Sequence, residues 1–560
     1  MMSMQFNPSM PATIGTRRTL PVVVGLITLA CATGVQAFQI DSSNPDIRMT
    51  WDNTIKYSLG YRLKDADPDV ADNSIGPQAN TNDGDLNFDK GLISNRLDIL
   101  SQFNLSYKRK YGLRLTGAAW YDDVYHRDTD NPGALGGALV NSRSVDYTQF
   151  TDATKDLHGG DAEILDAFAY GNFNVADKSL NLKLGRFTQL YGESLFFGSN
   201  GIAAAQTSLD LVKALSVPNS QFQEILRPVG QLSGQMQLSS DLTIGAYYQL
   251  EWRKTRIPGA GSYFSFADFV DEGGESLILG PGAVVYRGED IEPSDSGQFG
   301  MQVRFKTDNA EYGLYAAQYH DKMPQFYARP GVNVQPGSVG DYMQVFGEDI
   351  RTVGASFSTL VGETNVAGEL SFRDNQPLVA SGNAVITHAL SDGDNNAAYP
   401  VGRTMHLNLS MISVLPESAL WDGATFIGEF AYNRRLSISE NADQLDPSAT
   451  RSASALQFVF TPEYFQVLPG LDLKTPIGVG YGLSGRSSVN GVLFPSEGGG
   501  NISLGLTADY QRTWQAALNY THYIGSAGSI VKYGTAVPEL SYDNFHGDRD
   551  FISLSIQRTF

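Results

Sequence analysis

The sequence predicts an all-β fold, a transmembrane antiparallel β-barrel of about 18 strands (roughly 16–20) with long extracellular loops and one inward-folded loop helix. Three observations lead to this prediction: strands in which apolar and polar residues alternate, connections that alternate between long and short, and an N-terminal export signal. With 11% aromatic and only 18% charged residues, the 560-residue chain is unlike a disordered acidic one.

The alternation of apolar and polar residues is clearest from Trp51 to Leu63, where the odd positions are mostly apolar and the even positions are polar. The pattern recurs at 242–253 and 502–510. In a soluble sandwich the apolar face would pack in the core, whereas in a membrane barrel it faces lipid and the polar face lines the lumen. The alternating stretches reach the ~9–11 residues that a tilted span needs, and aromatic residues lie near their ends, so the barrel is favoured.

The connections between the predicted strands fall into two classes. Short turns are expected at Arg109-Lys110, Asp177-Lys178 and Arg512-Thr513, and long loops at 64–94, 125–163, 191–227 and 254–297. Outer-membrane barrels have short periplasmic turns and long extracellular loops, and an even strand number places both termini in the periplasm. The predicted strands are 49–63, 95–108, 111–124, 164–176, 179–190, 228–239, 242–253, 298–307, 311–320, 351–361, 364–374, 402–415, 423–435, 453–462, 471–484, 501–511, 514–524 and 550–560.

The chain begins with a predicted signal peptide, 1–37, so the barrel would occupy 38–560 of a protein exported to the Gram-negative outer membrane. Arg17 and Arg18 precede an apolar run, and Val35-Gln36-Ala37 resembles a cleavage site. The single cysteine, Cys31, would leave with this signal, which excludes disulfides from the mature chain. The last strand ends in Phe560, which resembles the signal read by the barrel assembly machinery.

The amino-acid composition and the missing sequence motifs argue against some classes of function. With 60 acidic and 40 basic residues the net charge is −20, so we expect no nucleic-acid partner, because such binders need a basic face. Expected partners are instead outer-membrane lipid and lipopolysaccharide. No G-x-S-x-G, P-loop or H-E-x-x-H motif occurs, and His522 lies on an apolar strand face, so we expect no enzyme.

The long loop 191–227 is predicted to act as a constriction or plug. It contains an apolar segment, Ile202 to Leu215, which we interpret as a helix that needs shelter inside the lumen. Charged residues select solutes in pores; the alternative is that these charges pair with one another and brace the loop. The candidate lumen and constriction residues are Arg186, Glu193, Asp210, Lys213, Glu251 and Arg253.

An acidic segment in the first long loop offers oxygen ligands at alternate positions, Asp83, Asp85, Asn87 and Asp89. Calcium prefers such ligands, so Ca²⁺ is the one candidate cofactor. The glycine of an EF-hand loop is replaced by Phe88, and a solvated acidic loop is the alternative interpretation.

Several motifs point to one family. They are Trp51-Asp52-Asn53-Thr54-Ile55-Lys56-Tyr57-Ser58, Asp83-Gly84-Asp85-Leu86-Asn87-Phe88, Asn95-Arg96-Leu97-Asp98, Ala119-Trp120-Tyr121-Asp122, Gly185-Arg186-Phe187, Gly192-Glu193-Ser194-Leu195-Phe196-Phe197, Gly201-Ile202-Ala203, Glu251-Trp252-Arg253 and Gly261-Ser262-Tyr263. The chain resembles a family of proteobacterial, Pseudomonas-type outer-membrane barrels catalogued as a domain of unknown function, although Tyr191 stands where that family has tryptophan. The resemblance implies a barrel whose gene lies near the genes of a periplasmic partner and of an inner-membrane exporter of the resistance-nodulation type. It also implies a link to the metabolism of hydrophobic compounds.

We therefore expect an outer-membrane channel or transporter for a small hydrophobic or amphipathic ligand. Two alternatives stay open: a general diffusion pore of porin type, and a surface barrel with a structural or adhesive role. Mixed charges on the predicted lumen face, among them Lys56, Glu369 and Arg373, indicate no simple preference for cations or anions.

Overall fold

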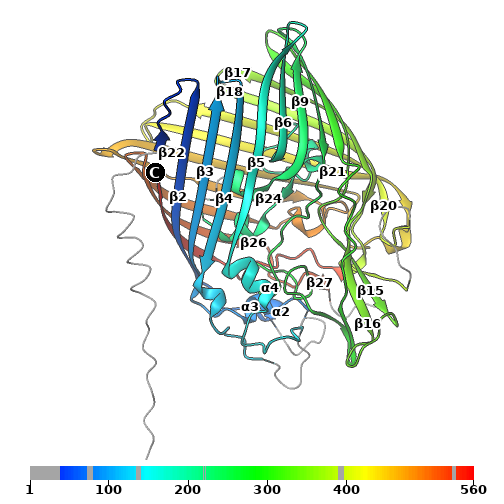
Figure 1. Ribbon diagram of the computed structural model, residues 1–560. Helices are drawn as coiled ribbons and strands as arrows, with labels where there is room; N and C mark the ends of the chain where they lie inside the picture. The colour runs from blue at the N-terminus through cyan, green and yellow to red at the C-terminus, as the bar shows by residue number, and fades with distance from the viewer. Residues whose placement is uncertain are drawn as a thin grey trace, which may run out of the picture.

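The computed structural model describes residues 38–71, 80–133, 141–218, 220, 222–388, 396–532 and 538–560, and the predicted signal peptide, 1–37, lies outside these. The described chain forms a closed antiparallel barrel of 18 strands (Figure 1). The predicted fold class is therefore confirmed. Among the described residues, no helix has the length and apolar character needed to cross a membrane.

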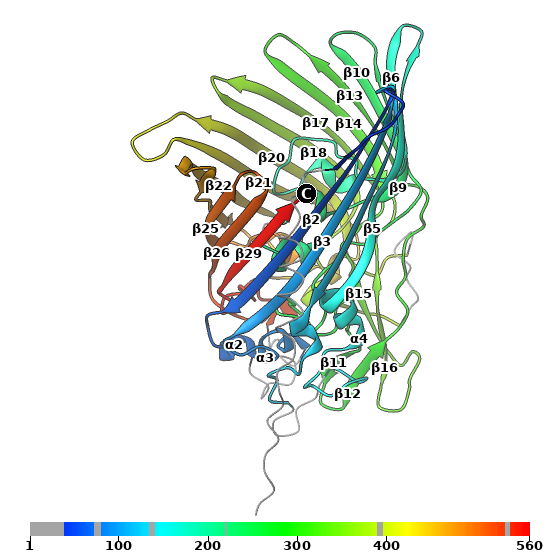
Figure 2. The ribbon, with the colours of Figure 1, turned by 60° about the vertical axis from the view of Figure 1, so that its left-hand side comes forward.

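Each barrel strand pairs with its neighbours along the wall, and the first closes on the last, from Thr54 opposite Thr559 to Arg62 opposite Phe551 (Figure 2). Every predicted strand overlaps an observed one. The strands are β2 (Ile47–Arg62), β3 (Leu92–Tyr107), β4 (Tyr111–Asp122), β5 (Gly160–Val175), β6 (Lys178–Phe187), β9 (Val229–Gln237), β10 (Leu242–Gln249), β13 (Phe299–Lys306), β14 (Ala310–Tyr319), β17 (Ile350–Val361), β18 (Thr364–Pro377), β20 (Val401–Leu415), β21 (Gly423–Glu440), β22 (Ser452–Leu468), β24 (Ile477–Ser484), β25 (Gly500–Tyr510), β26 (Trp514–Ile524) and β29 (Phe551–Thr559).

One predicted strand, 471–484, is interrupted. A short strand β23 (Leu471–Lys474) precedes β24, and Thr475-Pro476 separates the two. Proline has no N–H to donate to a neighbouring strand, which explains the break. A further short strand, β1 (Phe38–Ile40), pairs with the start of β2.

The two faces of the barrel wall are chemically opposite. Leu184 and Val353 point outward and are 56% and 57% exposed, as lipid-facing residues of a barrel are when lipid is absent. Glu369 lies on the inner face and is only 3% exposed. Trp51 and Tyr121 are exposed toward opposite ends of their strands, where an aromatic girdle meets the membrane interface.

One end of the barrel carries tight turns. The β3–β4 turn has Lys108 and Arg109 at φ 52° and 55°, and the Lys110 N–H donates to the Tyr107 carbonyl at 3.0 Å. This is the primed turn geometry whose twist suits a two-stranded hairpin. Ala176-Asp177 and Gln511-Arg512 repeat it, so the short turns lie one residue earlier than predicted.

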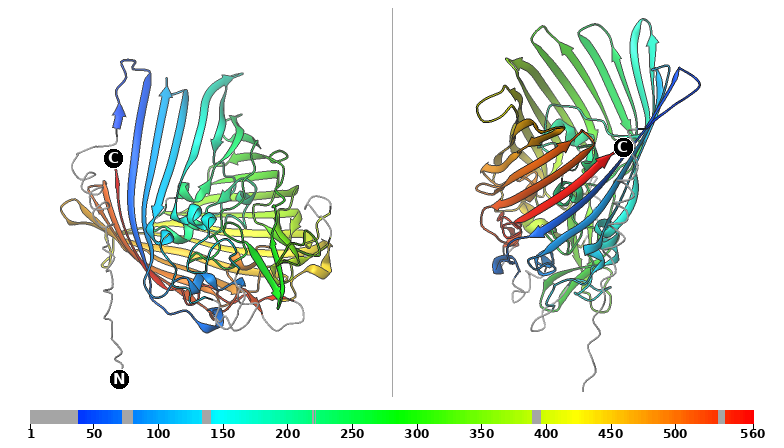
Figure 3. Two further views of the ribbon diagram at one scale, coloured as in Figure 1. Left: turned by 60° about the horizontal axis from the view of Figure 1, so that its bottom comes forward. Right: turned by 90° about the vertical axis from the view of Figure 1, so that its left-hand side faces the viewer.

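The other end carries the long loops, the extracellular end in an outer-membrane barrel. They fold into a layer, here called the cap, that lies across the barrel mouth in Figure 3 (left). Its five-stranded sheet has a core that includes Phe269, Val285, Phe326 and Tyr342. The cap elements are α2 (Pro68–Ala71), α3 (Asp83–Leu86), η2 (Asp123–His126), α4 (Asp152–Thr154), η4 (Lys155–Gly159), β11 (Ser276–Gly280), β12 (Ala283–Arg287), β15 (Gln325–Pro330), β16 (Gly340–Val345), η6 (Ser381–Asn383), β19 (Val385–Ile386), η7 (Ala442–Gln444), η8 (Gly491–Leu493), β27 (Val531–Lys532) and β28 (Glu539–Leu540).

The loop 191–227 does not contain the single helix that we predicted over Ile202 to Leu215. It folds as η5 (Ile202–Ala205), β7 (Ser208–Leu209), α5 (Leu211–Ser216), α6 (Phe222–Ile225) and β8 (Leu226–Arg227). The helix prediction is wrong because Asp210 begins a new helix: its backbone is extended and its side chain accepts the N–H of Lys213 at 2.9 Å. Aspartate favours such an N-cap over a helix interior.

Candidate functional site

The segment 191–218, here called the plug, is bonded to the inner face of the wall. Glu369 on β18 accepts the backbone N–H of Glu193 at 2.6 Å with one carboxylate oxygen and that of Ile202 at 2.9 Å with the other. The Ile202 side chain packs among Tyr191, Tyr247 and Tyr315, the last two of which lie on β10 and β14. One carboxylate thus binds two points of the plug that are nine residues apart in sequence.

A second carboxylate repeats this arrangement. One oxygen of Glu429, on β21, accepts three consecutive backbone N–H groups, those of Leu195 at 3.1 Å, Phe196 at 2.5 Å and Phe197 at 2.9 Å. The other oxygen accepts the side-chain amide of Asn408 at 2.7 Å. Successive N–H groups that point at one anion form a nest, and here the wall supplies the anion.

Between these anchors, Asn200 is completely buried and bonded to two wall strands, β20 and β21. Its amide donates to the Asn408 side chain at 2.9 Å and to the Tyr432 carbonyl at 3.2 Å. Its side-chain oxygen accepts from His406 at 3.1 Å and from Asn433 at 3.2 Å, with the His406 ring nitrogen as donor. The backbone carbonyls of Ser199 and Gly201, on either side, accept from Arg373.

Glycine permits this close approach. A Cβ on Gly201 would lie 2.3 Å from a Glu369 oxygen and 2.7 Å from the Ser194 hydroxyl. Gly192 also has a φ of +92°, which favours glycine, and its Cβ would meet the other Glu369 oxygen at 2.3 Å. The motifs Gly192 to Phe197 and Gly201 to Ala203 are therefore the parts of the plug that touch the anchors.

The six charged residues predicted for the constriction lie in three separate groups. Arg186 pairs with Glu251 at 2.6 Å, and Arg253 is 3.9 Å from the same carboxylate. Glu193 is 3.6 Å from Arg304 on β13. In these groups Arg186 and Glu193 pair with Glu251 and Arg304, outside the loop 191–227, and not with another charge in the described part of that loop.

The remaining two, Asp210 and Lys213, belong to a further network of ion pairs. Asp210 pairs with Arg256 at 2.6 Å and Lys213 with Glu163 at 2.8 Å, while Arg256 also reaches Glu163 at 2.9 Å. The ring of Trp120 lies 5.0 Å from the Lys213 ammonium and completes the group. Sequence reasoning missed Glu163, Arg256 and Trp120 because they come from three distant segments.

The four residues predicted to bind calcium do not surround a common point. The carboxylate of Asp85 is taken by Arg549, at 3.0 and 2.6 Å, and by Arg62 at 2.9 Å, so it is an ion-pair partner rather than the cation ligand that we expected. Asn87 donates to the Gly261 carbonyl at 2.8 Å, and the Asp89 N–H donates to Asp130 at 2.9 Å. Within the described ranges, no group of three or more His, Cys, Asp or Glu residues could hold a metal ion.

Asp83, the fourth of the residues predicted to bind calcium, faces another acidic side chain. One oxygen of Asp268 accepts the N–H groups of Asn82 at 2.8 Å and Asp83 at 3.2 Å, which brings the two carboxyl groups together in the cap. Burial raises the pKa of both Asp83 and Asp268, and the charge of Asp83 raises that of Asp268 further. The pair of carboxyl groups therefore favours a proton.

A cavity of about 600 Å³ lies between the plug and the cap. This volume is within the range of pockets that hold drug-sized ligands, ~300–1,000 Å³. Its charged lining residues are Asp321, Lys322 and Arg373, and apolar side chains dominate the rest of the wall, among them Leu190, Phe196, Phe266, Phe326, Val379 and Leu493. No sequence signal marked this cavity, since its walls come from the plug, the cap and β18.

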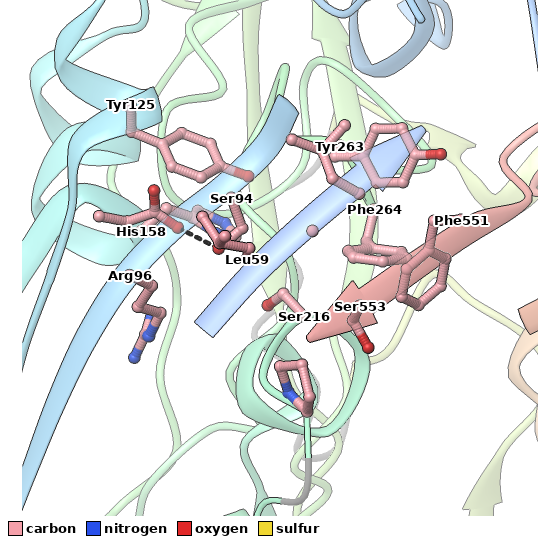
Figure 4. A pocket seen from close by; sticks show the side chains of 14 residues that line it. Leu59, Ser94, Arg96, Tyr125, His158, Ser216, Tyr263, Phe264, Phe551 and Ser553 are labelled. Atoms are coloured by element: carbon pink, nitrogen blue, oxygen red, sulfur yellow. Dashed lines mark hydrogen bonds between the residues drawn. The ribbon is translucent and has the colours of Figure 1, made fainter. Parts of the chain in front are cut away.

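A second pocket opens near the strand ends of β2, β3 and β29, and its lining includes Ser94, Arg96, His158 and Phe551 (Figure 4). Its free volume is about 10 Å³, the space of a single water molecule. The Ser94 hydroxyl donates to Asp122 at 2.6 Å beside it. The larger cavity is therefore the candidate site for an organic ligand.

The solved structures similar to this chain include two proteins of Acinetobacter baumannii and one of Pseudomonas aeruginosa. OccAB4 of Acinetobacter baumannii is 10% identical over 92% of this chain and 100% of its own, with a TM-score of 0.40. The outer-membrane channel DcaP of the same species is 9% identical over 94% and 100%, with a TM-score of 0.37. OpdK of Pseudomonas aeruginosa, solved with vanillate, is 10% identical over 91% and 98%, with a TM-score of 0.37.

These likenesses are too distant to carry an argument about this chain. No curated protein matches the sequence significantly. The family suspected from the sequence motifs is confirmed: the model described as "Protein of unknown function (DUF1302)" matches residues 18–560, and the chain belongs to that family.

Proposed function

We propose that this protein is a plugged outer-membrane channel that admits a hydrophobic or amphipathic small molecule through the cavity between plug and cap. The observation that carries the proposal is the anchoring of the plug. Five backbone N–H groups of one loop donate to two carboxylates of the wall, Glu369 and Glu429, so the docked plug occupies one defined position.

The chemistry of the anchors supports a plug that can be released. The contacts to Glu369 and Glu429 are hydrogen bonds from a loop backbone, and a segment of this kind can leave without disturbing the strand pairing behind it. The apolar cavity lies directly against the plug, so a ligand that enters it also contacts the element that must move. Differential binding to the docked and undocked states is what allows a ligand to shift such an equilibrium.

The test is single-channel recording of the mature protein in a planar bilayer, beside a variant in which 203–215 is replaced by a glycine–serine segment of equal length. We expect rare openings of the parent and frequent, larger openings of the variant. The same type of replacement in the exposed tip 333–337 of the β15–β16 hairpin is the control, and it should leave the parent behaviour unchanged. Silence of both parent and plug variant would refute the channel.

The alternatives make different predictions in the same recording. A general diffusion pore would show stable openings of the parent, without the replacement. A structural or adhesive barrel has no need of a releasable plug, and its conductance would not respond to the replacement. The predicted partners, namely lipopolysaccharide, the assembly machinery and a periplasmic or inner-membrane export system, and the predicted calcium ion stay predictions.

A further inference from the structure

We infer that the cavity between plug and cap takes an amphipathic monoanion, a single carboxylate on an apolar body, with its acid group held at Lys322 and Arg373. This inference rests on the proposed function, because it names the class of ligand for the same cavity. It starts from the two cations in the cavity wall.

Lys322 is buried, with 6% of its surface exposed. Its ammonium donates to the His320 carbonyl at 3.2 Å and lies 5.1 Å from the ring of Tyr319. An ammonium has three N–H donors, and only one of them has a hydrogen-bond partner in the described part of the chain. Burial lowers the pKa of Lys322 to about 8; the charge of Asp321 opposes this effect, and that of Arg373 adds to it.

Arg373 is the second cation of the wall. Its guanidinium donates to the Ser199 carbonyl at 3.0 Å, the Gly201 carbonyl at 2.8 Å and the Gln376 side chain at 3.4 Å. All three acceptors are neutral, so Arg373, like Lys322, has no carboxylate partner among the described residues. Arg373 and Lys322 lie close enough for the charge of one to affect the other.

Several other buried cations in the described part of the chain are neutralised. Arg549 pairs with Asp85 at 2.6 Å, and Arg256 pairs with Asp210 at 2.6 Å. Buried charge is costly unless it is paired. Lys322 and Arg373 face a cavity without such a partner among the described residues, and this arrangement favours a negative charge that arrives from outside the chain.

Asp321 does not fill this role. One of its carboxylate oxygens accepts the backbone N–H of Lys322 at 2.7 Å and that of Met323 at 3.0 Å, so it caps a turn, and it forms no ion pair with the Lys322 ammonium within the described residues. Two cations and one carboxylate leave the cavity wall with a net charge of +1. One carboxylate on the ligand balances that charge, and the apolar wall around it accommodates a hydrocarbon body.

The experiment measures equilibrium binding of two probes of equal length, dodecanoate and dodecanol, to the mature protein in lipid nanodiscs, with empty nanodiscs as the reference. The wild-type protein should bind dodecanoate more tightly. The variant Lys322→Met should weaken dodecanoate binding about tenfold to a hundredfold, the range of a lost charge-assisted hydrogen bond, and leave dodecanol binding unchanged. Lys90→Met removes a half-exposed cap lysine and is the matched control.

Equal affinity for the two probes in the wild type, or an unchanged ratio in Lys322→Met, would overturn the inference and leave the cavity as a site for neutral ligands. Binding of neither probe would overturn both the inference and the proposed ligand site. If Lys322→Met does not fold, the wild-type protein is measured between pH 7 and pH 10 instead. Its preference for dodecanoate should fall over this range, because Lys322 loses its proton. A constant preference would overturn the inference. The charged and titratable groups that face Lys322 in this measurement are Tyr319, His320, Asp321 and Arg373.

Discussion

Replacing Glu429 with glutamine isolates the charge of one plug anchor. Glu429→Gln keeps the size of the side chain, but the oxygen that accepts the N–H groups of Leu195, Phe196 and Phe197 becomes neutral. A hydrogen bond to a charged acceptor contributes about 1.5–3 kcal/mol and one to a neutral acceptor about 0.5–1.5 kcal/mol. Three weakened bonds therefore destabilise the docked plug by roughly 3 kcal/mol, an upper value because neighbouring bonds are not additive.

At about 1.4 kcal/mol for each factor of ten, this loss increases the ratio of undocked to docked plug by about a hundredfold. Single-channel recording should therefore show openings of Glu429→Gln that are far more frequent than those of the parent and equal in size to those of the plug-replacement variant. Glu363→Gln, in the exposed β17–β18 turn, removes a carboxylate from the opposite end of the barrel and should behave as the parent. An opening frequency of Glu429→Gln that matches the parent, in a protein that retains its melting temperature, would refute the role of Glu429 as an anchor.

Two further predictions test the plug contact and the cap. Gly201→Ala should also increase openings, because its Cβ would lie 2.3 Å from a Glu369 oxygen, whereas Gly198→Ala, with no atom within 4 Å of the new Cβ, should not; equal recordings of the two alanine variants would contradict the close-approach argument. The cap should be more stable at pH 5 than at pH 8, because the pKa values of Asp83 and Asp268 are raised in the folded protein. The stability that these two protonated groups contribute is fully present below their unfolded pKa of about 4. It is lost as the pH rises toward their folded pKa. The melting temperature should fall across this range, and Asp268→Asn should flatten the slope; a slope that is unchanged in Asp268→Asn would assign the effect to other groups.

The strands could be predicted because their signal is local. Each barrel strand faces lipid on one side and a polar interior on the other, so period-two alternation marks both its position and its orientation, as at Trp51 to Leu63. The short turns were predicted to within one residue, because the strands on either side of each turn are marked by this local pattern. The continuous helix over Ile202 to Leu215 was the clearest error, because the N-cap at Asp210 overrides the apolar composition of the segment.

The candidate site could not be predicted in the same way. Glu369 and Glu429 are on the polar register of their strands, as expected of lumen residues, but that register does not say which of its carboxylates meets the plug. Asp85 and Arg549 are 464 residues apart, and their pairing depends on the closed barrel that brings the first and last loops together. The pairing of Asp85 with Arg62 and Arg549 could not be predicted, because both partners are remote in sequence.

The seam between β2 and β29 has a consequence for how the protein is made. The hydroxyl groups of Thr54 and Thr559 meet at 2.9 Å across it, although the two residues are separated by 505 positions. Until the C-terminal strand has been exported, β2 presents a row of unpaired N–H and C=O groups, which is a template for aggregation. Contacts of such sequence separation form slowly. The nascent chain must therefore be kept from pairing with its neighbours throughout its passage, and truncation by a single strand should yield an open, aggregation-prone sheet rather than a smaller barrel.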